Sequence, residues 1–247
     1  MVNISVWVMN ILSLQVYNKI VAALAILILG GMLYGFFKNF TEIRKHSVVK
    51  IIYLVITLVF FLAHTQILFV MNIELIHSIQ FGILAFLVFP ITRRFTYTIL
   101  ITTVLGYSDE LFQYLILYPE TTDYFDFNDV VMNQLGMGFS FLLIFNAGIK
   151  HNKFLSITRW WRSPALLSFM VIACISSLLL HYSIMVQYAG EAMDSTLLVL
   201  NETNGPESFW RYIPDSTIVY HVLKPTEGIL LNIGLIVFYS LLDLFEQ

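Results

Sequence analysis

The sequence has little charge and almost no cysteine, and each shortage excludes a class of protein. Charged residues make up 12% of the 247 residues, whereas soluble domains usually contain about 25%. The single cysteine, Cys174, has no second cysteine with which to form an intramolecular disulfide. Basic residues are not in excess, since the formal net charge is -3, and a nucleic-acid-binding domain needs a basic face. A disulfide scaffold is therefore excluded, and no nucleic-acid partner is expected.

Long hydrophobic runs are abundant. Hydrophobic residues make up 58% of the chain, and seven runs approach the roughly 20 residues that a membrane-spanning helix requires. The runs are Ile20–Phe37, Ile51–Val70, Leu75–Pro90, Phe95–Tyr118, Val130–Gly148, Pro164–Met185 and Gly228–Phe245. We predict an all-α, polytopic transmembrane helix bundle of about seven helices, forming a single membrane domain over residues 1–247. Ile4–Tyr17 either lies flat at the interface or extends the first span.

Basic residues are distributed unevenly between the loops. Ten of the thirteen fall on one side of the membrane: Lys38, Arg44, Lys45, Lys50, Arg93, Arg94, Lys150, Lys153, Arg159 and Arg162. The positive-inside rule makes these loops cytoplasmic, so we expect a multi-pass plasma-membrane protein with its N-terminus outside and its C-terminus in the cytoplasm. Acidic residues concentrate on the outer side, mainly in the long outer loop Gln187–Glu227 before the last helix.

Polar side chains recur in three consecutive runs, although a charge in the bilayer core costs on the order of 2.5 to 3.5 kcal/mol. The set comprises Glu74, His77 and Gln80, then Asp109, Glu110 and Gln113, then Asp126, Asp129 and Asn133. Within each group the spacing keeps several members on one helix face. At 1.5 Å rise per residue, Asp109 is about 21 Å along its helix from Phe95, so all three groups fall at one level in the outer half of the membrane. The sequence therefore predicts an outward-facing polar cluster.

Such a cluster has two plausible chemical uses and one structural use. It could bind a divalent cation through its oxygen atoms, or act as a general acid and base whose pKa values burial and like charge separate. Alternatively, its members hydrogen-bond one another and hold the helices together. We identify His77, Asp109 and Glu110 as candidate catalytic residues. The candidate substrate-binding residues are Glu74, Gln80, Gln113, Asp126, Asp129, Asn133, Arg211 and Lys224. The residues identify no cofactor and leave metal binding open.

Three motifs in this region resemble the pattern of VanZ-like membrane proteins. They are Glu74-x-x-His77-x-x-Gln80-Phe81, Asp109-Glu110-x-x-Gln113 and Asp126-x-x-Asp129-x-x-x-Asn133-x-x-Gly136. The resemblance implies a VanZ-like core at about residues 51–148. It also implies a possible link to resistance against the glycopeptide antibiotic teicoplanin, since the family takes its name from a protein associated with that resistance.

The sequence departs from the family pattern at three points. Gln80 stands where an acid is usual, Phe81 stands where Tyr is usual, and the loop Pro119–Asn128 lacks the usual Arg. If that Arg holds an anion in relatives, this chain must supply a cation from elsewhere. Arg211 and Lys224 are the available substitutes.

The outer segment combines aromatic rings with both signs of charge. Its notable residues are Trp210, Arg211, Tyr212, Tyr220, His221, Lys224 and Glu227. This mixture suits a lipid headgroup or a saccharide, with Arg or Lys holding phosphate. The alternative is an interfacial aromatic belt with snorkelling cations. The expected partners are membrane lipids and a lipid-linked envelope precursor.

Three functions fit these observations. The first is an envelope-facing enzyme or binding protein that acts on a lipid-linked or headgroup substrate at the outer leaflet. The second is a proton-coupled transporter, although the inverted repeats and interrupted helices usual in that class are not evident. The third is a non-catalytic membrane partner whose polar network is structural.

Several single residues outside the cluster have structural interpretations. A lone intramembrane histidine such as His64 usually has a helix or carbonyl partner. Gly136 and Gly138, like Gly30 and Gly31, predict close contacts between helices.

Overall fold

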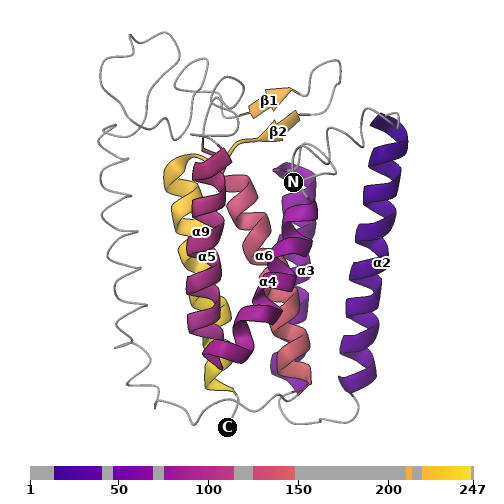
Figure 1. The fold of residues 1–247 in the computed structure, drawn as a ribbon, viewed down its shortest axis with the longest axis vertical. Coiled ribbons are helices and arrows are strands. Elements are labelled where there is room, and N and C mark those ends of the chain that lie inside the picture. Colours follow the sequence, from indigo (N-terminus) through magenta and orange to yellow (C-terminus); the bar gives the residue numbers. More distant parts are fainter. Residues whose placement is uncertain are drawn as a thin grey trace.

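The computed structural model describes residues 14–40, 47–68, 75–113, 125–147, 210–212 and 219–245. These residues are mostly helical. The α-helices are α2 (Leu14–Phe40), α3 (Ser47–Ile67), α4 (Leu75–Thr92), α5 (Phe95–Phe112), α6 (Phe127–Asn146) and α9 (Pro225–Ser240), and the 3-10 helix η3 (Leu241–Leu244) follows α9. Strands β1 (Trp210–Tyr212) and β2 (Val219–His221) form an antiparallel pair, with Arg211 opposite Tyr220. The strand pair lies across one end of the bundle, called here the hairpin end (Figure 1).

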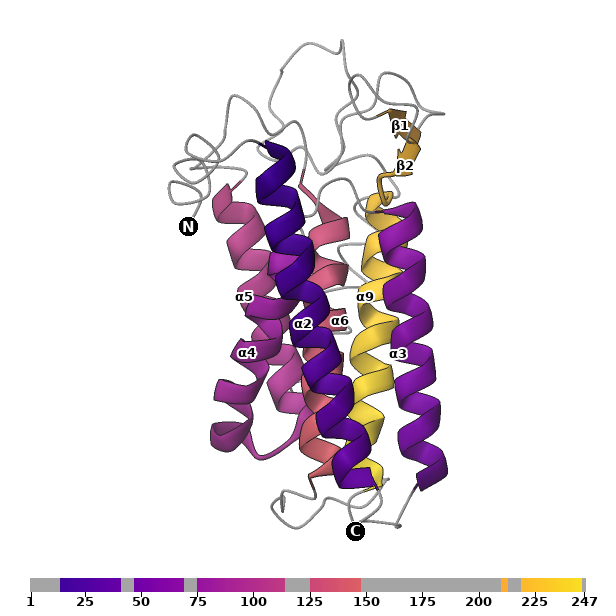
Figure 2. The ribbon, with the colours of Figure 1, turned by 90° about the vertical axis from the view of Figure 1, so that its right-hand side faces the viewer.

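Helix α6 lies at the centre of the described bundle. It contacts each of the five other described α-helices, most extensively α4, and Figure 2 shows it between neighbours on both sides. Nearly all of its side chains are buried, including the polar Asn133, Gln134 and Ser140. A helix buried on all sides presents its polar residues to neighbouring helices, where they can form a site away from lipid.

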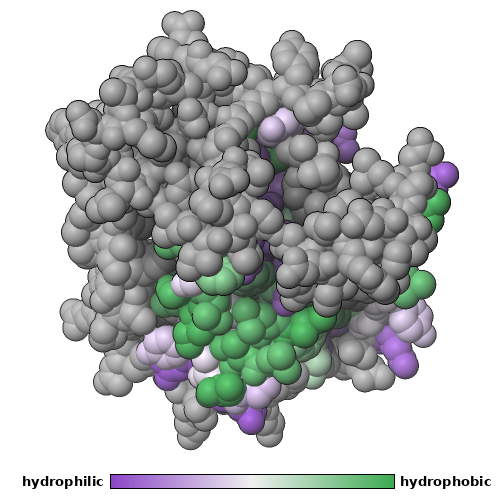
Figure 3. Space-filling model, turned by 45° about the horizontal axis from the view of Figure 1, so that its top comes forward, coloured by the Kyte–Doolittle hydropathy of each residue, from purple (hydrophilic) through white to green (hydrophobic). Residues whose placement is uncertain are grey.

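Apolar side chains cover the outside of several helices. Exposed examples are Ile51, Val55 and Val59 of α3, Ile83 and Leu87 of α4, and Ile101 and Val104 of α5. An apolar area is visible on the face drawn in Figure 3. Among the described residues, three helical segments are long and apolar enough to cross a membrane: Val48–Ile67, Leu75–Thr92 and Pro225–Leu244. Outward-facing apolar surface of this kind fits a lipid environment, so this is a membrane protein.

Helices α4 and α6 approach closely because their contact contains small residues. A Cβ atom at Gly136 would lie only 2.0 Å from the backbone oxygen of Ser78. One turn further along, the Ser140 hydroxyl donates a 2.8 Å hydrogen bond to the Gly82 carbonyl. Small residues allow two backbones to meet where lipid offers no hydrophobic driving force. The predicted close contact at Gly136 is therefore confirmed.

Of the other predicted glycine contacts, the one at Gly138 is confirmed and those at Gly30 and Gly31 are not. A Cβ at Gly138 would lie 2.1 Å from the hydroxyl oxygen of Tyr239 in α9, so this contact is also confirmed. At Gly30 and Gly31 no atom of the described residues lies within 4 Å of an added Cβ. Close helix contact was the wrong interpretation there within the described part of the chain, because α2 carries these glycines on an open face.

Two arginines, Arg93 and Arg94, connect helices α4 and α5. Arg93 has a φ of 52°, in the left-handed region that commonly ends a helix. At the start of α5, the buried carboxylate of Asp243 accepts hydrogen bonds from the backbone N–H groups of Phe95 and Thr96. These bonds satisfy donors that have no partner within the helix. The start of α5 at Phe95 agrees with the prediction.

The helix boundaries differ from the predictions by a few residues. Helix α3 begins at Ser47 rather than Ile51, and α6 begins at Phe127 rather than Val130 because Asp126 caps its N-terminus. Helix α9 begins at Pro225, so Glu227 lies in its first turn and not in the outer segment. Leu14–Tyr17 extends the first helix, whereas the rest of Ile4–Tyr17 lies outside the described residues.

Part of the predicted organisation lies outside the described residues. The predicted helix Pro164–Met185 lies outside the described residues, as do Tyr114–Tyr118 of the predicted fourth helix. Most of Gln187–Glu227 also lies outside them. The count of about seven helices and the single domain over residues 1–247 therefore stay predictions.

Candidate functional site

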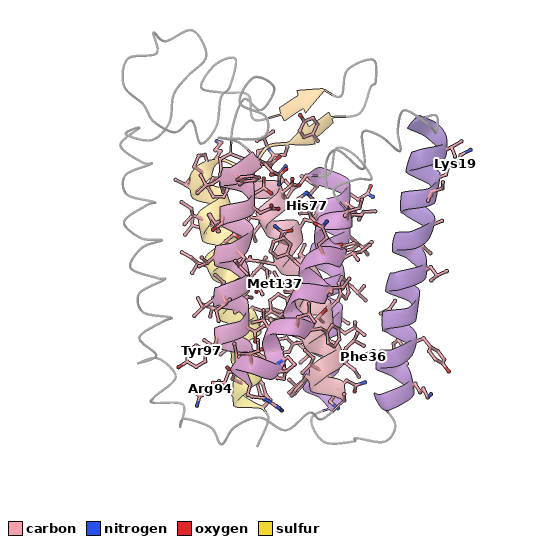
Figure 4. All side chains as sticks on the ribbon, in the orientation of Figure 1. Lys19, Phe36, His77, Arg94, Tyr97 and Met137 are labelled. Atoms are coloured by element: carbon pink, nitrogen blue, oxygen red, sulfur yellow. The ribbon has the colours of Figure 1, made fainter. Side chains whose placement is uncertain are left out.

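A polar cluster at the hairpin end brings together one residue from each of α4, α5 and α6. His77, Glu110 and Asp129 each offer a nitrogen or oxygen atom, and these atoms lie within 4.8 Å of one another. Figure 4 labels His77 toward the hairpin end, with Met137 nearer the middle of the bundle. The cluster therefore lies toward one end of an otherwise apolar assembly. We call His77, Glu110 and Asp129 the three-residue cluster.

The contact between α4 and α6 positions His77 and Asp129. Ser78, the residue after His77, is the one whose backbone meets Gly136. Asp129 lies two turns earlier on α6, and its Oδ2 is 3.7 Å from Nε2 of His77. Both side chains are largely buried, with 18% and 15% of their surface exposed. Close backbone packing at Gly136 therefore places an imidazole beside a carboxylate in the bundle.

Glu110 is the most deeply buried member of the cluster, with 5% exposure. Its Oε1 accepts a 3.3 Å hydrogen bond from Nε2 of Gln113, which also donates to Oδ2 of Asp109 at 3.3 Å. Asp109 is half-buried and Ser108 is exposed. The adjacent carboxylates thus occupy different surroundings, one inside the bundle and one at its surface.

Asp126 adds a further carboxylate at the start of α6. Its Oδ1 accepts a 2.8 Å hydrogen bond from the backbone N–H of Asn128, as a helix N-cap does. Burial, and then the neighbouring Asp129 carboxylate, raise the pKa of Asp126 to about 7. Asp109, Asp126 and Asp129 all lie close enough to Glu110 to repel its charge. The cluster thus concentrates negative charge.

Asn133 lies one turn below Asp129 on α6. It is completely buried, and neither its Oδ1 nor its Nδ2 has a hydrogen-bond partner in the described part of the chain. Its side chain interacts with His77, and its Nδ2 faces Gly106 of α5, where an added Cβ would lie 3.2 Å away. Asn133 therefore occupies the interior between α4, α5 and α6, directly beneath the three-residue cluster.

The described part of the chain does not place four of the predicted site residues in the cluster. Glu74 lies outside the described residues. Gln80 is half-buried one turn after His77 on α4. Arg211 is described only as backbone in β1, and the exposed Lys224 precedes α9, where its backbone N–H donates to Glu227. The roles of these four residues in substrate binding stay predictions.

Sequence reasoning missed Asn128, which connects three chain segments at the hairpin end by hydrogen bonds. Asn128 is 2% exposed, and its Nδ2 donates to the carbonyls of Leu68 and His221 while its Oδ1 accepts from the Leu223 N–H. The His64 ring contacts the Asn128 carbonyl at 2.9 Å, so the predicted carbonyl partner of His64 is confirmed. The available signal was an asparagine two residues after the capping residue Asp126, in the first turn of an otherwise largely apolar helix.

A family model described as VanZ-LLP1: VanZ/LLP1 matches residues 21–149, more than half of the chain. The chain belongs to the VanZ/LLP1 family. No curated protein and no solved structure matches it. The family match contains all three residues of the cluster together with Asp109, Asp126 and Asn133. The β1–β2 hairpin and α9 lie beyond the matched residues. In this VanZ/LLP1 protein the hairpin end therefore includes structure from outside the family match.

Proposed function

We propose that this VanZ/LLP1 family protein binds and modifies the headgroup of a lipid-linked envelope substrate at the outer leaflet. The observation that carries the proposal is the meeting of His77, Glu110 and Asp129 near one end of an apolar bundle. Intramembrane ionisable residues are costly and usually functional. A headgroup, unlike an acyl chain, is a ligand for which such a cluster has chemical use.

His77, Asp109 and Glu110 are the groups that would act on the headgroup. The half-buried Asp109 lies next to the exposed Ser108, and the deeply buried Glu110 shares Gln113 with it. Two carboxylates in different surroundings suit proton transfer in opposite directions. Lys224 is exposed at the same end, and Arg211 lies on β1. A basic residue at this end would suit a phosphate group.

The distribution of basic residues supports an outward-facing hairpin end. Lys38 is exposed at the last turn of α2, and Arg94 lies at the end of the bundle opposite the hairpin (Figure 4). Cytoplasmic ends of spanning helices are rich in Lys and Arg. This orientation places the cluster at the outer leaflet and the C-terminus in the cytoplasm.

Cysteine labelling of whole cells tests this orientation. In a Cys174→Ala background, a membrane-impermeant maleimide should label Lys224→Cys and leave Lys38→Cys unlabelled until the cells are permeabilised. The two lysines form a matched pair, since both are exposed and lie at opposite ends of the bundle. The reverse labelling pattern would place the cluster at the inner leaflet and reject the proposal.

Lipid binding and drug susceptibility test the function itself. The protein in nanodiscs should retain a polyprenyl-linked precursor or phosphatidylglycerol in native mass spectrometry, in preference to phosphatidylcholine. Asp109→Asn and Glu110→Gln should abolish this preference while the protein stays folded, and should abolish any rise in teicoplanin resistance that the protein confers. Ser108→Ala is the matched control, because within the described residues its exposed hydroxyl bonds only to the Val104 carbonyl of its own helix. Unchanged lipid preference and resistance in both carboxylate variants would contradict the proposal.

A further inference from the structure

We infer that His77, Glu110 and Asp129 bind a divalent transition-metal cation of the Zn²⁺ type, with Asn133 lying against the site. The inference goes beyond the proposed function, because it assigns a metal centre whatever substrate the protein takes. Each of the three residues comes from a different helix, so the site is built by the packing of α4, α5 and α6. Sites on packed helices hold ligands more rigidly than sites on loops.

The distances within the cluster are close to those that a shared cation requires. Zinc lies about 2.0 to 2.2 Å from nitrogen or carboxylate oxygen ligands, so two ligands of one ion are at most about 4.4 Å apart. Nε2 of His77 and Oδ2 of Asp129, at 3.7 Å, already satisfy this limit. The full set, within 4.8 Å, needs only a small side-chain rotation to close around an ion. No backbone movement is required.

The charge of the cluster also favours a cation. Glu110 faces Asp109, Asp126 and Asp129, and within the described residues the one ion pair made by any of these four carboxylates is that of Asp129 with His77. Buried like charges are unfavourable unless a partner neutralises them. A divalent cation at the centre of the cluster would neutralise two negative charges and relieve this repulsion.

Unsatisfied polar atoms provide an observation independent of the acidic cluster. Both polar atoms of Asn133 are buried without a hydrogen-bond partner in the described part of the chain, although the side chain lies beside His77. Nδ1 of His77 and Oδ1 of Asp129 are likewise buried without a hydrogen-bond partner in the described part of the chain. Most buried polar atoms in proteins have a partner, and a group without one indicates an unoccupied interaction such as that with an ion. Here the unsatisfied atoms belong to two of the proposed ligands and to the asparagine beside them.

The ligand types select the class of ion. An imidazole nitrogen with two carboxylates suits Zn²⁺, whereas Mg²⁺ and Ca²⁺ prefer oxygen ligands alone. Three protein ligands also match a catalytic rather than a purely structural zinc site, since a fourth position stays open for water or substrate. Asn133 is placed to orient such a group. We therefore expect Zn²⁺ to bind more tightly than Mg²⁺ or Ca²⁺.

Metal analysis of the full-length protein in detergent tests the inference. The protein is stripped with a chelator, incubated with ZnCl₂ alone, desalted and analysed by mass spectrometry of the metal. We expect about one zinc per chain, as in single-ion sites, retention against a large excess of Mg²⁺ or Ca²⁺, and a higher melting temperature with zinc. Glu110→Gln and Asp129→Asn should each lose most of the bound zinc.

Glu227→Gln is the matched control. Glu227 pairs with His221 at 3.0 Å, so it is another carboxylate beside an imidazole at the same end of the bundle. Among the described residues this pair belongs to no group of three possible metal ligands. This variant should retain zinc like the unmodified protein. Equal zinc content in Glu110→Gln, Asp129→Asn and Glu227→Gln would overturn the inference, as would no retained zinc in the unmodified protein.

Cobalt spectroscopy separates loss of a ligand from loss of the fold. The Co²⁺-loaded protein should show visible d–d absorption, and His77→Cys should add a thiolate-to-cobalt charge-transfer band in the near ultraviolet. Absence of that band in a folded, cobalt-binding His77→Cys protein would remove His77 from the site and overturn the inference. Zinc binding without lipid selectivity would leave the metal site standing and reject the proposed function. Lipid selectivity without zinc binding would do the reverse.

Discussion

The side chain of Asp243 and the backbone of Phe95, 148 residues apart in the sequence, form a 2.8 Å hydrogen bond that fixes the start of α5. The same carboxylate accepts hydrogen bonds from the N–H and the hydroxyl of Thr96. The side chain of Arg94, the residue before α5, forms no capping hydrogen bond. Asp243 of η3 caps the helix instead. Since α5 carries Glu110 at its other end, this contact helps to set the position of the cluster.

Replacing Asp243 by Asn should destabilise the protein by about 2 kcal/mol or more. The amide keeps one acceptor but presents N–H donors toward the donors of Phe95 and Thr96, and buried hydrogen bonds to charged groups contribute about 1.5 to 3 kcal/mol each. Thermal unfolding in detergent measures the change. Ser108→Ala, on the exposed face of α5, should change stability by less than about 0.5 kcal/mol. Equal stability of the two variants would contradict the assigned capping role.

Replacing Gly136 by Ala should separate α4 from α6. The new methyl group would lie 2.0 Å from the Ser78 backbone oxygen, which cannot move as a side chain can. We expect a loss of about 1 to 3 kcal/mol from overpacking and, since Ser78 follows His77, weaker zinc binding. Gly234→Ala is the control, because nothing in the described structure lies within 4 Å of its added Cβ. That change should be neutral or stabilise α9 by up to about 1 kcal/mol. The prediction fails if both alanine variants unfold at the same temperature.

Replacing Asn128 by Ala should release the segment that precedes α9. Three hydrogen bonds are lost, and the buried carbonyl of Leu68 and N–H of Leu223 are left unsatisfied, at about 1 to 3 kcal/mol. Hydrogen exchange followed by mass spectrometry should show faster exchange of the Leu223 amide. The amide of Phe145, at the far end of α6, is the internal reference and should exchange at its original rate. Unchanged protection at Leu223 would show that the anchor lies elsewhere.

Replacing Glu110 by Gln distinguishes a binding site from a structural polar network. If the network is structural, the substitution removes a stabilising group and lowers the melting temperature of the metal-free protein. We expect no decrease, because in the described structure Glu110 accepts one side-chain hydrogen bond, from Gln113, and faces three other carboxylates. The amide keeps its size and removes repulsion. A melting temperature clearly below that of the metal-free unmodified protein would favour the structural interpretation.

The zinc-loaded protein should respond in the opposite sense. There the substitution removes a ligand, so the increase in melting temperature produced by zinc should shrink or disappear. The comparison uses one variant in two metal states, which separates the contribution of the ion from that of packing.

Helix content, membrane association and the family pattern follow from the order of amino acids. Local hydrophobicity specifies which segments lie in lipid, so α3 and α4 were predicted within four residues at each end. The spacing of Asp109, Glu110 and Gln113 on one helix likewise specifies that Gln113 can reach both carboxylates, as it does. These are contacts within one turn or two, which a helical repeat determines by itself.

The tertiary structure decided which of the predicted polar residues meet. The sequence placed nine of them at one level and singled out His77, Asp109 and Glu110, whereas the atoms that meet belong to His77, Glu110 and Asp129. Their meeting depends on the crossing of α4 and α6 at Gly136 and on the direction in which each helix faces its neighbours. The anchoring roles of Asn128 and Asp243 depend on residues 95 and 148 positions away. Helical periodicity specifies faces and depths, whereas contacts between distant segments depend on how all the helices pack together.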